Sequence, residues 1–439
     1  MKYREHSAAV VRLLFAGWIT FAAGKASGQG NWIPIGPEGG GISSIAQDPK
    51  NSSVLYLASE ARAENPIVKI YKSTNKGGSW TFLSSVQGYV SCFEVSRKKN
   101  SDLFLGGNSV FFRSTDSGVT WSSFYPNQGF YEIASDSLDA NVVHACGYDF
   151  STPKTSMAYF KSTDKGTSWT SARPPMSATA EGGYAYDMAV DPKNSKTVWI
   201  GGYIRDNNTI NSALFRTTNG GTSWTDVAGT IGGQVYDINI DSTTVKRIVV
   251  LTSSGMYRTT NNGISWQQNS GFVSPYNKEC LAQDPKNKNT FYVGGYNCIY
   301  KSTDGGVNWK SYLTGSSGGG CYTILVDQGN FSNLFLGNVG GVLKSTNGGD
   351  TWAGSNTGLI LANVTALEIK PTAPSVLYVA MEYSDLYKTN NALGKADSPQ
   401  SVSWEFFFKI PDCSSWHVEK NIFCEPSNPD VLYVFKGYG

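Results

Sequence analysis

Short apolar runs alternate with polar turns along almost the whole chain. In the segment from Ile45 to Ser59, IAQDPKNSSVLYLAS, an apolar run is followed by a turn with Asp and Pro and then by a run rich in Val, Leu and Tyr. Runs of β-branched and aromatic residues bounded by turn residues are typical of strands. The same pattern returns in MAVDPKNSKTVWIGG (188–202), LAQDPKNKNTFYVGG (281–295) and LEIKPTAPSVLYVAM (367–381). The pattern predicts an all-β protein built from a repeated unit.

A turn that contains glycine and ends in tryptophan, here called the glycine turn, follows the strand pairs. Its first copy is YKSTNKGGSW, from Tyr71 to Trp80. Six further clear copies are FRSTDSGVTW, FKSTDKGTSW, FRTTNGGTSW, YRTTNNGISW, YKSTDGGVNW and LKSTNGGDTW, and successive tryptophans lie 41 to 55 residues apart. An eighth copy, LYKTNNALG, is interrupted before Trp404. This period is typical of a propeller blade with four strands, a to d, in which strand d begins at the tryptophan.

The chain contains eight recognisable units and part of a ninth. The ninth strand pair is IFCEPSNPDVLYVFK, from Ile422 to Lys436, and no glycine turn follows it. The segment Asn31–Ile35 resembles an isolated strand d. We expect the two ends of the chain to pair and close the ring, which would hide both sheet edges. The predicted domain is therefore a single β-propeller over residues 31–439, with a truncated chain or an incomplete last blade.

The N-terminus has the plan of a secretory signal. Three basic residues, Lys2, Arg4 and Arg12, precede the apolar run Leu13–Ala23, and small residues follow it. The run is too short to span a membrane comfortably. We therefore expect residues 1–28 to be removed, the mature chain to have no membrane span, and the protein to be secreted or held outside the cytoplasm, at the cell surface or in the periplasm.

Charge and metal-ligating residues exclude several classes of function. Charged residues make up 16% of the chain and the formal net charge is +2, so we expect no nucleic acid partner. The chain has seven cysteines but no CxxC, and its histidines are His6, His144 and His417. We therefore expect no metal site, no histidine-based triad and no cofactor. Cys280 with Cys298, and Cys413 with Cys424, are the nearest candidate disulfides.

The glycine turns resemble the Asp-box, or BNR repeat. The resemblance covers nearly the whole mature chain and implies a β-propeller, as in sialidases, xyloglucanases, sortilin-type receptors and photosystem II assembly-factor propellers. These families differ in function, so the motif indicates a fold and no activity. Ser73 and Asn75 can bond nearby backbone amides, Gly77 supplies an unusual backbone conformation, and Trp80 can pack between blades. We predict a structural role for the turn itself.

Candidate chemistry lies on the opposite face, where the loops after strands b and d meet the central channel. Aligning the units on Asp48 gives one residue per unit at the channel mouth. That column reads Ser44, Cys92, Glu132, Asp187, Asp237, Cys280, Thr323, Ala366 and Asn421. A tyrosine precedes each of its three carboxylates, in Tyr131-Glu132, Tyr186-Asp187 and Tyr236-Asp237. Tyrosines could stack on sugar rings, and loops of the same units add Arg205 and Asp206 as candidate ligand contacts.

Three interpretations of this column remain open. Its carboxylates could bond backbone amides or water in a polar channel, could contact a glycan or peptide, or could catalyse glycoside hydrolysis, which uses paired carboxyl groups. The arginine cluster and Phe/Tyr-Arg-Ile-Pro segment of sialidases are absent. Resemblance to xyloglucanases at Gly39–Gly41 and Leu55-Tyr56 implies a catalytic base at Glu60, although that family takes its partner carboxylate from a second propeller.

The leading hypothesis is a propeller that recognises a polysaccharide or an extracellular protein through its loop face near the third to fifth units. The alternative is a glycoside hydrolase of the xyloglucanase type that cleaves β-glucan chains with Glu60, Glu132, Asp187 or Asp237.

Overall fold

The computed structural model describes residues 40–61, 66–124, 128–151, 154–241, 247–269, 280–295, 298–314, 320–359, 364–370, 372–373, 375–381, 386–390, 405–408, 418–425 and 431–438. The chain divides into two units, Met1–Pro34 and Ile35–Gly439. The first unit, the predicted signal at 1–28, the strand-like segment Asn31–Ile35, Trp404 and Cys413 lie outside the described residues.

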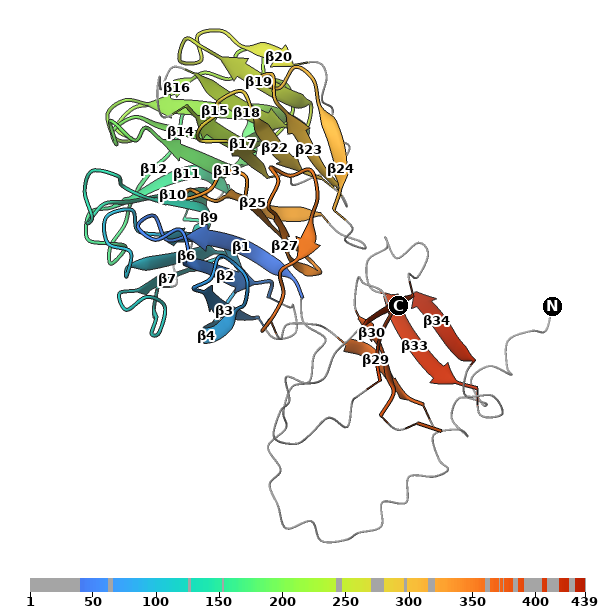
Figure 1. Cartoon of the computed structure of the whole chain (residues 1–439). Coiled ribbons are helices and arrows are strands. Elements are labelled where there is room, and N and C mark those ends of the chain that lie inside the picture. The colour runs from blue at the N-terminus through green and yellow to red at the C-terminus, as the bar shows by residue number, and fades with distance from the viewer. Residues whose placement is uncertain are drawn as a thin grey trace, which may run out of the picture. The chain divides into compact units, whose positions relative to one another are not determined.

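The described residues form strands and no helix, as predicted, in eight sheets of four antiparallel strands (Figure 1). Within each sheet the strands follow one another in chain order. The first sheet contains β1 (Ile42–Gln47), β2 (Leu55–Ser59), β3 (Ile67–Ser73) and β4 (Thr81–Gln87). The second contains β5 (Val90–Val95), β6 (Leu103–Gly107), β7 (Val110–Ser114) and β8 (Ser122–Phe124). The third contains β9 (Gln128–Ser135), β10 (Val143–Asp149), β11 (Ser156–Ser162) and β12 (Thr170–Ala172).

The fourth sheet has the longest strands, β13 (Ala180–Val190), β14 (Val198–Asp206), β15 (Thr209–Thr217) and the short β16 (Thr225–Asp226). The fifth contains β17 (Val235–Ile240), β18 (Ile248–Thr252), β19 (Gly255–Thr259) and β20 (Gln267–Asn269). The sixth contains β21 (Leu281–Gln283), β22 (Phe291–Gly294), β23 (Cys298–Ser302) and β24 (Lys310–Leu313). The seventh contains β25 (Cys321–Val326), β26 (Leu334–Asn338), β27 (Gly341–Ser345) and β28 (Ala353–Gly354).

The eighth sheet contains β29 (Val364–Ile369), β30 (Leu377–Met381), β31 (Leu386–Thr389) and β32 (Glu405–Phe408). A ninth sheet has two strands, β33 (Val418–Cys424) and β34 (Leu432–Tyr438), as the sequence predicts. These two sheets pack on one another, because Tyr378 lies in one buried cluster with Ile422 and Cys424. The prediction of eight blades and part of a ninth is confirmed.

The glycine turn is held by its own polar side chains. The Gly77 amide donates to Ser73 Oγ at 2.9 Å, and the Ser79 amide donates to Asn75 Oδ1 at 2.8 Å. Gly77 has a φ of 73°, in the left-handed region that side chains disfavour. Trp80 is 3% exposed and packs with Phe335 and other apolar residues of the seventh sheet. The turn thus has the structural role that its sequence predicts.

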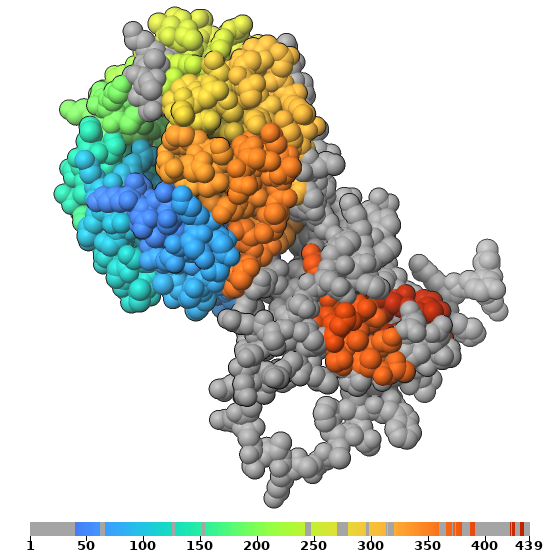
Figure 2. Space-filling view, in the orientation of Figure 1, coloured from blue at the N-terminus to red at the C-terminus, as the bar shows by residue number. Residues whose placement is uncertain are grey.

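Seven buried apolar clusters join the first seven sheets in a ring. Six of them lie between sheets that follow one another in the chain, and one joins the seventh sheet to the first. Figure 2 shows the first sheet, in blue, against the seventh, in orange. The ring therefore closes between β1–β4 and β25–β28, and not by pairing of the chain ends as expected. The reason is packing, because Trp80 of the first blade lies in one buried apolar cluster with Phe335 of the seventh.

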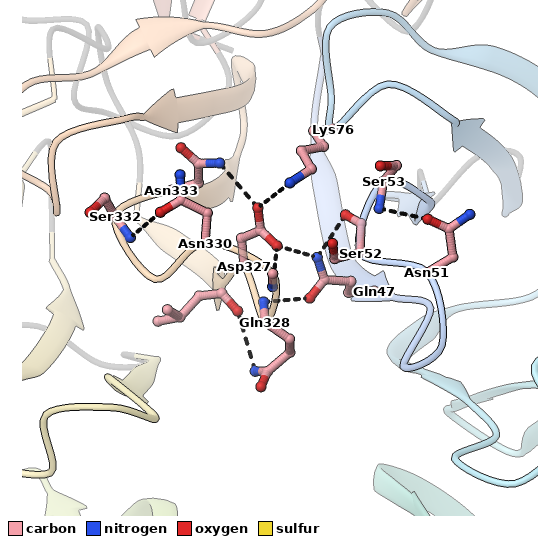
Figure 3. A network of polar contacts seen from close by, with 12 residues as sticks. Gln47, Asn51, Ser52, Ser53, Lys76, Asp327, Gln328, Asn330, Ser332 and Asn333 are labelled. Carbon is pink, nitrogen blue, oxygen red and sulfur yellow. Dashed lines mark hydrogen bonds and ion pairs between the residues drawn. The ribbon is translucent and has the colours of Figure 1, made fainter.

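Polar bonds reinforce this closure on the face of the glycine turns (Figure 3). Asp327 accepts a hydrogen bond from Gln47 Nε2 at 2.9 Å and lies 3.5 Å from Lys76 Nζ. The Gln328 amide donates to Gln47 Oε1 at 2.8 Å, and Trp80 Nε1 donates to the Ser355 carbonyl at 2.7 Å. Among the described residues no strand is shared between the two blades, and side-chain packing and these bonds join them.

Candidate ligand pocket at the channel mouth

A cavity of about 720 Å³ lies where the first strands of the ring begin. All seven blades of the ring contribute residues to its wall. Seven of the nine predicted site residues line it together: Glu60, Tyr131, Glu132, Tyr186, Asp187, Tyr236 and Asp237. Of the column that the sequence defines at the channel mouth, the three carboxylates and Cys280 line this cavity.

Arg205 and Asp206 do not line this pocket. They end β14, which forms a hairpin with β15 through a two-residue turn at Asn207 and Asn208. Both asparagines have positive φ, 50° and 60°, as a type I′ turn requires. Arg205 is exposed, and one oxygen of the half-buried Asp206 has no hydrogen-bond partner among the described residues. The structure places these two residues on an extension of the fourth blade.

A β-bulge explains why tyrosine and carboxylate face the same cavity. In a regular strand, neighbouring side chains point to opposite faces. The pairing of β13 with β14 shifts between Ala185 and Asp187, which leaves Tyr186 as an extra residue. The same shift occurs at Tyr131 and Tyr236.

Glycine on the facing strand makes room for this bulge. A Cβ at Gly202 would overlap the carbonyl oxygen of Tyr184, so no larger residue fits there without movement of the backbone.

Two of the carboxylates bond the neighbouring blade. Asp187 Oδ2 accepts the amide of Ile238 at 2.5 Å, and Asp237 Oδ2 accepts the amide of Leu281 at 3.0 Å. Each bond runs from one blade to the first strand of the next. These carboxylates therefore help to fix the blade spacing, in agreement with the interpretation that they bond backbone amides.

Glu132 differs from the other two carboxylates. Within the part of the chain that the structure describes, its half-buried carboxyl has no hydrogen-bond partner. Burial raises its pKa well above the usual value, and the nearby charges of Asp187, Glu94 and Asp237 raise it further. Arg97 acts in the opposite direction. Glu132 is thus the carboxyl group of the column that is not engaged by the fold.

The pKa values of the two bonded carboxylates are raised as well. Burial raises the pKa of Asp187 to about 7, against the effect of the amides of Ile238 and Met188. Burial raises the pKa of Asp237 well above its usual value, and the charge of Asp187 adds to this. The column therefore holds protons at a pH where free carboxyl groups are ionised.

Sequence reasoning missed a group of rings beside the column. Tyr184 stacks on Tyr203 with ring centroids 5.5 Å apart, and Tyr148 lies 5.4 Å from Tyr131 and 5.2 Å from Tyr184. Tyr186 lies 5.6 Å from both Tyr131 and Tyr203. A signal was present, because Tyr148 and Tyr203 both follow a glycine at the same place in strand b of consecutive units.

A cysteine pair also lines the pocket. Cys280 and Cys321, from the sixth and seventh blades, have Sγ atoms 2.7 Å apart and are both free thiols. No disulfide joins Cys280 to Cys298, so that candidate pairing is not formed. The cysteine nearest to Cys280 in the sequence is not its neighbour in the fold, because the ring brings the starts of adjacent blades together.

Metal and membrane sites are not found among the residues that the structure describes. Within these ranges no group of three or more His, Cys, Asp or Glu side chains is placed to hold a metal ion. In the same ranges no helix is long and apolar enough to cross a membrane.

Comparison with known proteins shows the fold. No family model matches the chain, and no curated protein matches it. Among solved structures, the GH74 xyloglucanase from Xanthomonas campestris is similar, with a TM-score of 0.60 and 14% identity over 89% of this chain and 70% of that one. An ancestral GH74 enzyme gives a TM-score of 0.51 and 17% identity over 92% and 67%.

A third similar structure is that of the protein YCF48. YCF48 from Cyanidioschyzon merolae gives a TM-score of 0.50 and 16% identity over 70% of this chain and 96% of that one. At these identities the likeness shows the fold, a β-propeller, and no activity.

Proposed function

We propose that the protein is a recognition propeller located outside the cytoplasm, which binds a polysaccharide or protein chain in the pocket at the channel mouth. The proposal rests on one observation: two carboxylates of the column bond the fold, whereas the tyrosines before the column residues face the cavity. Asp187 and Asp237 are engaged by backbone amides of the next blade, while Tyr131 and Tyr186 present rings to the same cavity. Pockets of this size, with aromatic walls and a few polar groups, are typical ligand sites.

The test is ligand binding by the pocket tyrosines. The purified chain would be screened on a glycan array and against extracellular protein preparations, and hits would be measured by calorimetry. A Tyr131→Ala plus Tyr186→Ala variant should lose at least tenfold in affinity, since stacked rings contribute about 1 kcal/mol each beyond area burial. Tyr433→Ala, on the exposed surface of the ninth sheet, is the control and should bind normally. Unchanged binding by the double variant would show that the ligand binds outside this pocket.

A glycoside hydrolase is the second candidate. It is favoured by Glu60 and Glu132 lining one pocket, because a raised pKa is what a general acid needs. Incubation with xyloglucan and other β-glucans, followed by reducing-end analysis, tests it. Hydrolysis that Glu132→Gln abolishes would establish the enzyme. Absence of product with every glucan, from protein that binds one of them, would leave recognition as the function.

A further inference from the structure

Among the residues that the structure describes, the pocket wall is acidic and aromatic and carries no cationic side chain. It contains the four carboxyl groups of Glu60, Glu132, Asp187 and Asp237 together with five tyrosines, of which Tyr89 and Tyr322 were not predicted. None of the residues that line it is a lysine, arginine or histidine. This chemistry disfavours an anionic ligand and suits a cation, which aromatic faces and carboxylates both attract.

We infer that the pocket binds an organic cation, the lysine or arginine side chain of a basic peptide, between Glu132 and the rings of Tyr131 and Tyr186. The inference rests on the proposed function, since it takes the pocket to be a recognition site and names the chemistry of its ligand.

Geometry separates an organic cation from a metal ion. Metal ligands must converge on one point, and among the described residues no three acidic, cysteine or histidine side chains do so. A cavity of about 720 Å³ with carboxyl groups spread around its wall instead fits a ligand of many atoms. An ammonium or guanidinium group on a flexible stem can reach one carboxylate while its methylene groups pack on rings.

Glu132 is the group that gains most from such a ligand. It is half-buried, it has no hydrogen-bond partner among the described residues, and it lies in the field of Asp187 and Glu94, which the charge of Arg97 partly offsets. Burial and the neighbouring carboxylates favour the protonated form of Glu132 in the ligand-free fold, and a bound cation beside it favours the ionised form, with which it can pair. In the described part of the chain, the amides that bond Asp187 and Asp237 have no counterpart at Glu132.

The rings around Glu132 form an aromatic wall. Tyr131 and Tyr186 meet edge to face with centroids 5.6 Å apart, and Tyr186 lies 6.2 Å from Tyr236. Burial raises the pKa of Tyr131 to about 12, so its phenol stays neutral. Neutral phenol rings facing an ammonium group are the arrangement of known cation cages.

The rings continue outside the pocket, which favours a peptide over a free polyamine. Tyr148 lies 5.4 Å from Tyr131 and 4.7 Å from Phe150, and Phe150 is 49% exposed. Residues that flank a bound lysine can pack on this surface, whereas a polyamine has no apolar side chains to place there.

The experiment is calorimetric titration of the full chain with four probes: a capped tetralysine peptide, the same peptide acetylated on its ε-amines, spermidine, and a xyloglucan oligosaccharide. We expect the tetralysine peptide to bind, with affinity that falls as sodium chloride is added, and the acetylated peptide to bind at least about tenfold more weakly. Glu132→Gln and Tyr186→Leu should each weaken tetralysine binding about tenfold or more.

Matched controls are Glu181→Gln, an exposed carboxylate on the extension of the fourth blade, and Tyr433→Leu, and both should bind tetralysine normally. Thermal melting of each variant distinguishes lost binding from lost folding, and the salt dependence of the unaltered chain needs no variant.

Equal binding of the two peptides, or binding of spermidine without tetralysine, would overturn the inference. If the chain binds the oligosaccharide but neither peptide, and Tyr186→Leu loses that binding, the inference of a cationic ligand is overturned while the proposed function stands.

Discussion

Asp327 is the buried charge at the closure of the ring, and Asp327→Ala should open the ring there. The side chain is fully buried and accepts hydrogen bonds from Gln47 Nε2 at 2.9 Å, Asn333 Nδ2 at 3.0 Å and the Gly329 amide at 2.8 Å. Gln47 and Asn333 are each 8% exposed, so removal of the carboxylate leaves their amide groups buried without this acceptor. At about 1 to 3 kcal/mol for each of these two amide groups, the loss is about 2 to 6 kcal/mol, and it lies toward the lower end because Gln47 Nε2 keeps the Ser52 carbonyl as a second acceptor at 2.9 Å.

Hydrogen exchange measures where this loss appears. Because no strand in the described part of the chain spans the first and seventh blades, we expect exchange at residues 47–54 and 327–333 to accelerate about a hundredfold or more, with smaller effects in the third to fifth blades. Asp350→Ala is the matched control: Asp350 is 48% exposed and pairs with Lys301 at 2.8 Å, a surface ion pair worth about 0 to 1 kcal/mol. Uniform acceleration around the ring, or equal effects of the two substitutions, would refute the closure argument.

The pH dependence of the same variant has a defined sign. Although burial alone would raise it, hydrogen bonds from Asn333 and Gln47 hold the pKa of Asp327 below its usual value. A carboxyl group with a lowered folded pKa stabilises the fold above its unfolded pKa of about 4, and that contribution is lost as the pH falls below it. The difference in melting temperature between the unaltered chain and Asp327→Ala should therefore be full at neutral pH and shrink below about pH 4.

Three further outcomes are expected. Mild oxidation should join Cys280 to Cys321, detected by peptide mapping without reduction; a different partner thiol would contradict their 2.7 Å approach. Gly202→Ala should lower the melting temperature by several degrees, since its Cβ overlaps a facing carbonyl oxygen, whereas Gly320→Ala, with open space around it, should not. Asp187→Asn should gain stability relative to the unaltered chain as the pH rises from about 4 to 7. The reason is that the raised folded pKa of Asp187, about 7, makes its ionisation costly in the folded chain. A difference in melting temperature that does not change with pH would argue against this prediction.

Much of the fold could be predicted because its signals are local and repeated. Ser73, Asn75 and Gly77 define a turn through bonds within a few residues, and the distance between copies of that turn sets the blade length. Ring closure depends instead on the volume of the side chains packed between neighbouring blades, which sets how many blades complete the ring. The contact of Trp80 with Phe335 is long-range in sequence, so counting units could not reveal that the seventh blade meets the first.

The candidate site was predictable to the level of the column. Counting from the turn located Tyr186-Asp187 and its two relatives, but strand periodicity alone would place the two side chains on opposite faces. The bulge that brings both to the cavity depends on a facing glycine, Gly202, whose role is visible only once the strands are paired. The amide of Ile238 was equally hidden, because it belongs to the next blade.

The same column position serves two demands that conflict, and this conflict indicates where ligand binding is concentrated. A carboxylate that accepts an amide of the next blade, as Asp187 and Asp237 do, stabilises the ring and has less capacity for a ligand. Glu132 occupies the equivalent position without such a bond among the described residues, although its burial and the neighbouring charges make ionisation costly. A side chain that adds repulsion and no bond in the ligand-free fold is destabilising unless something else pairs with it. The third blade is therefore where a bound ligand stabilises the fold most.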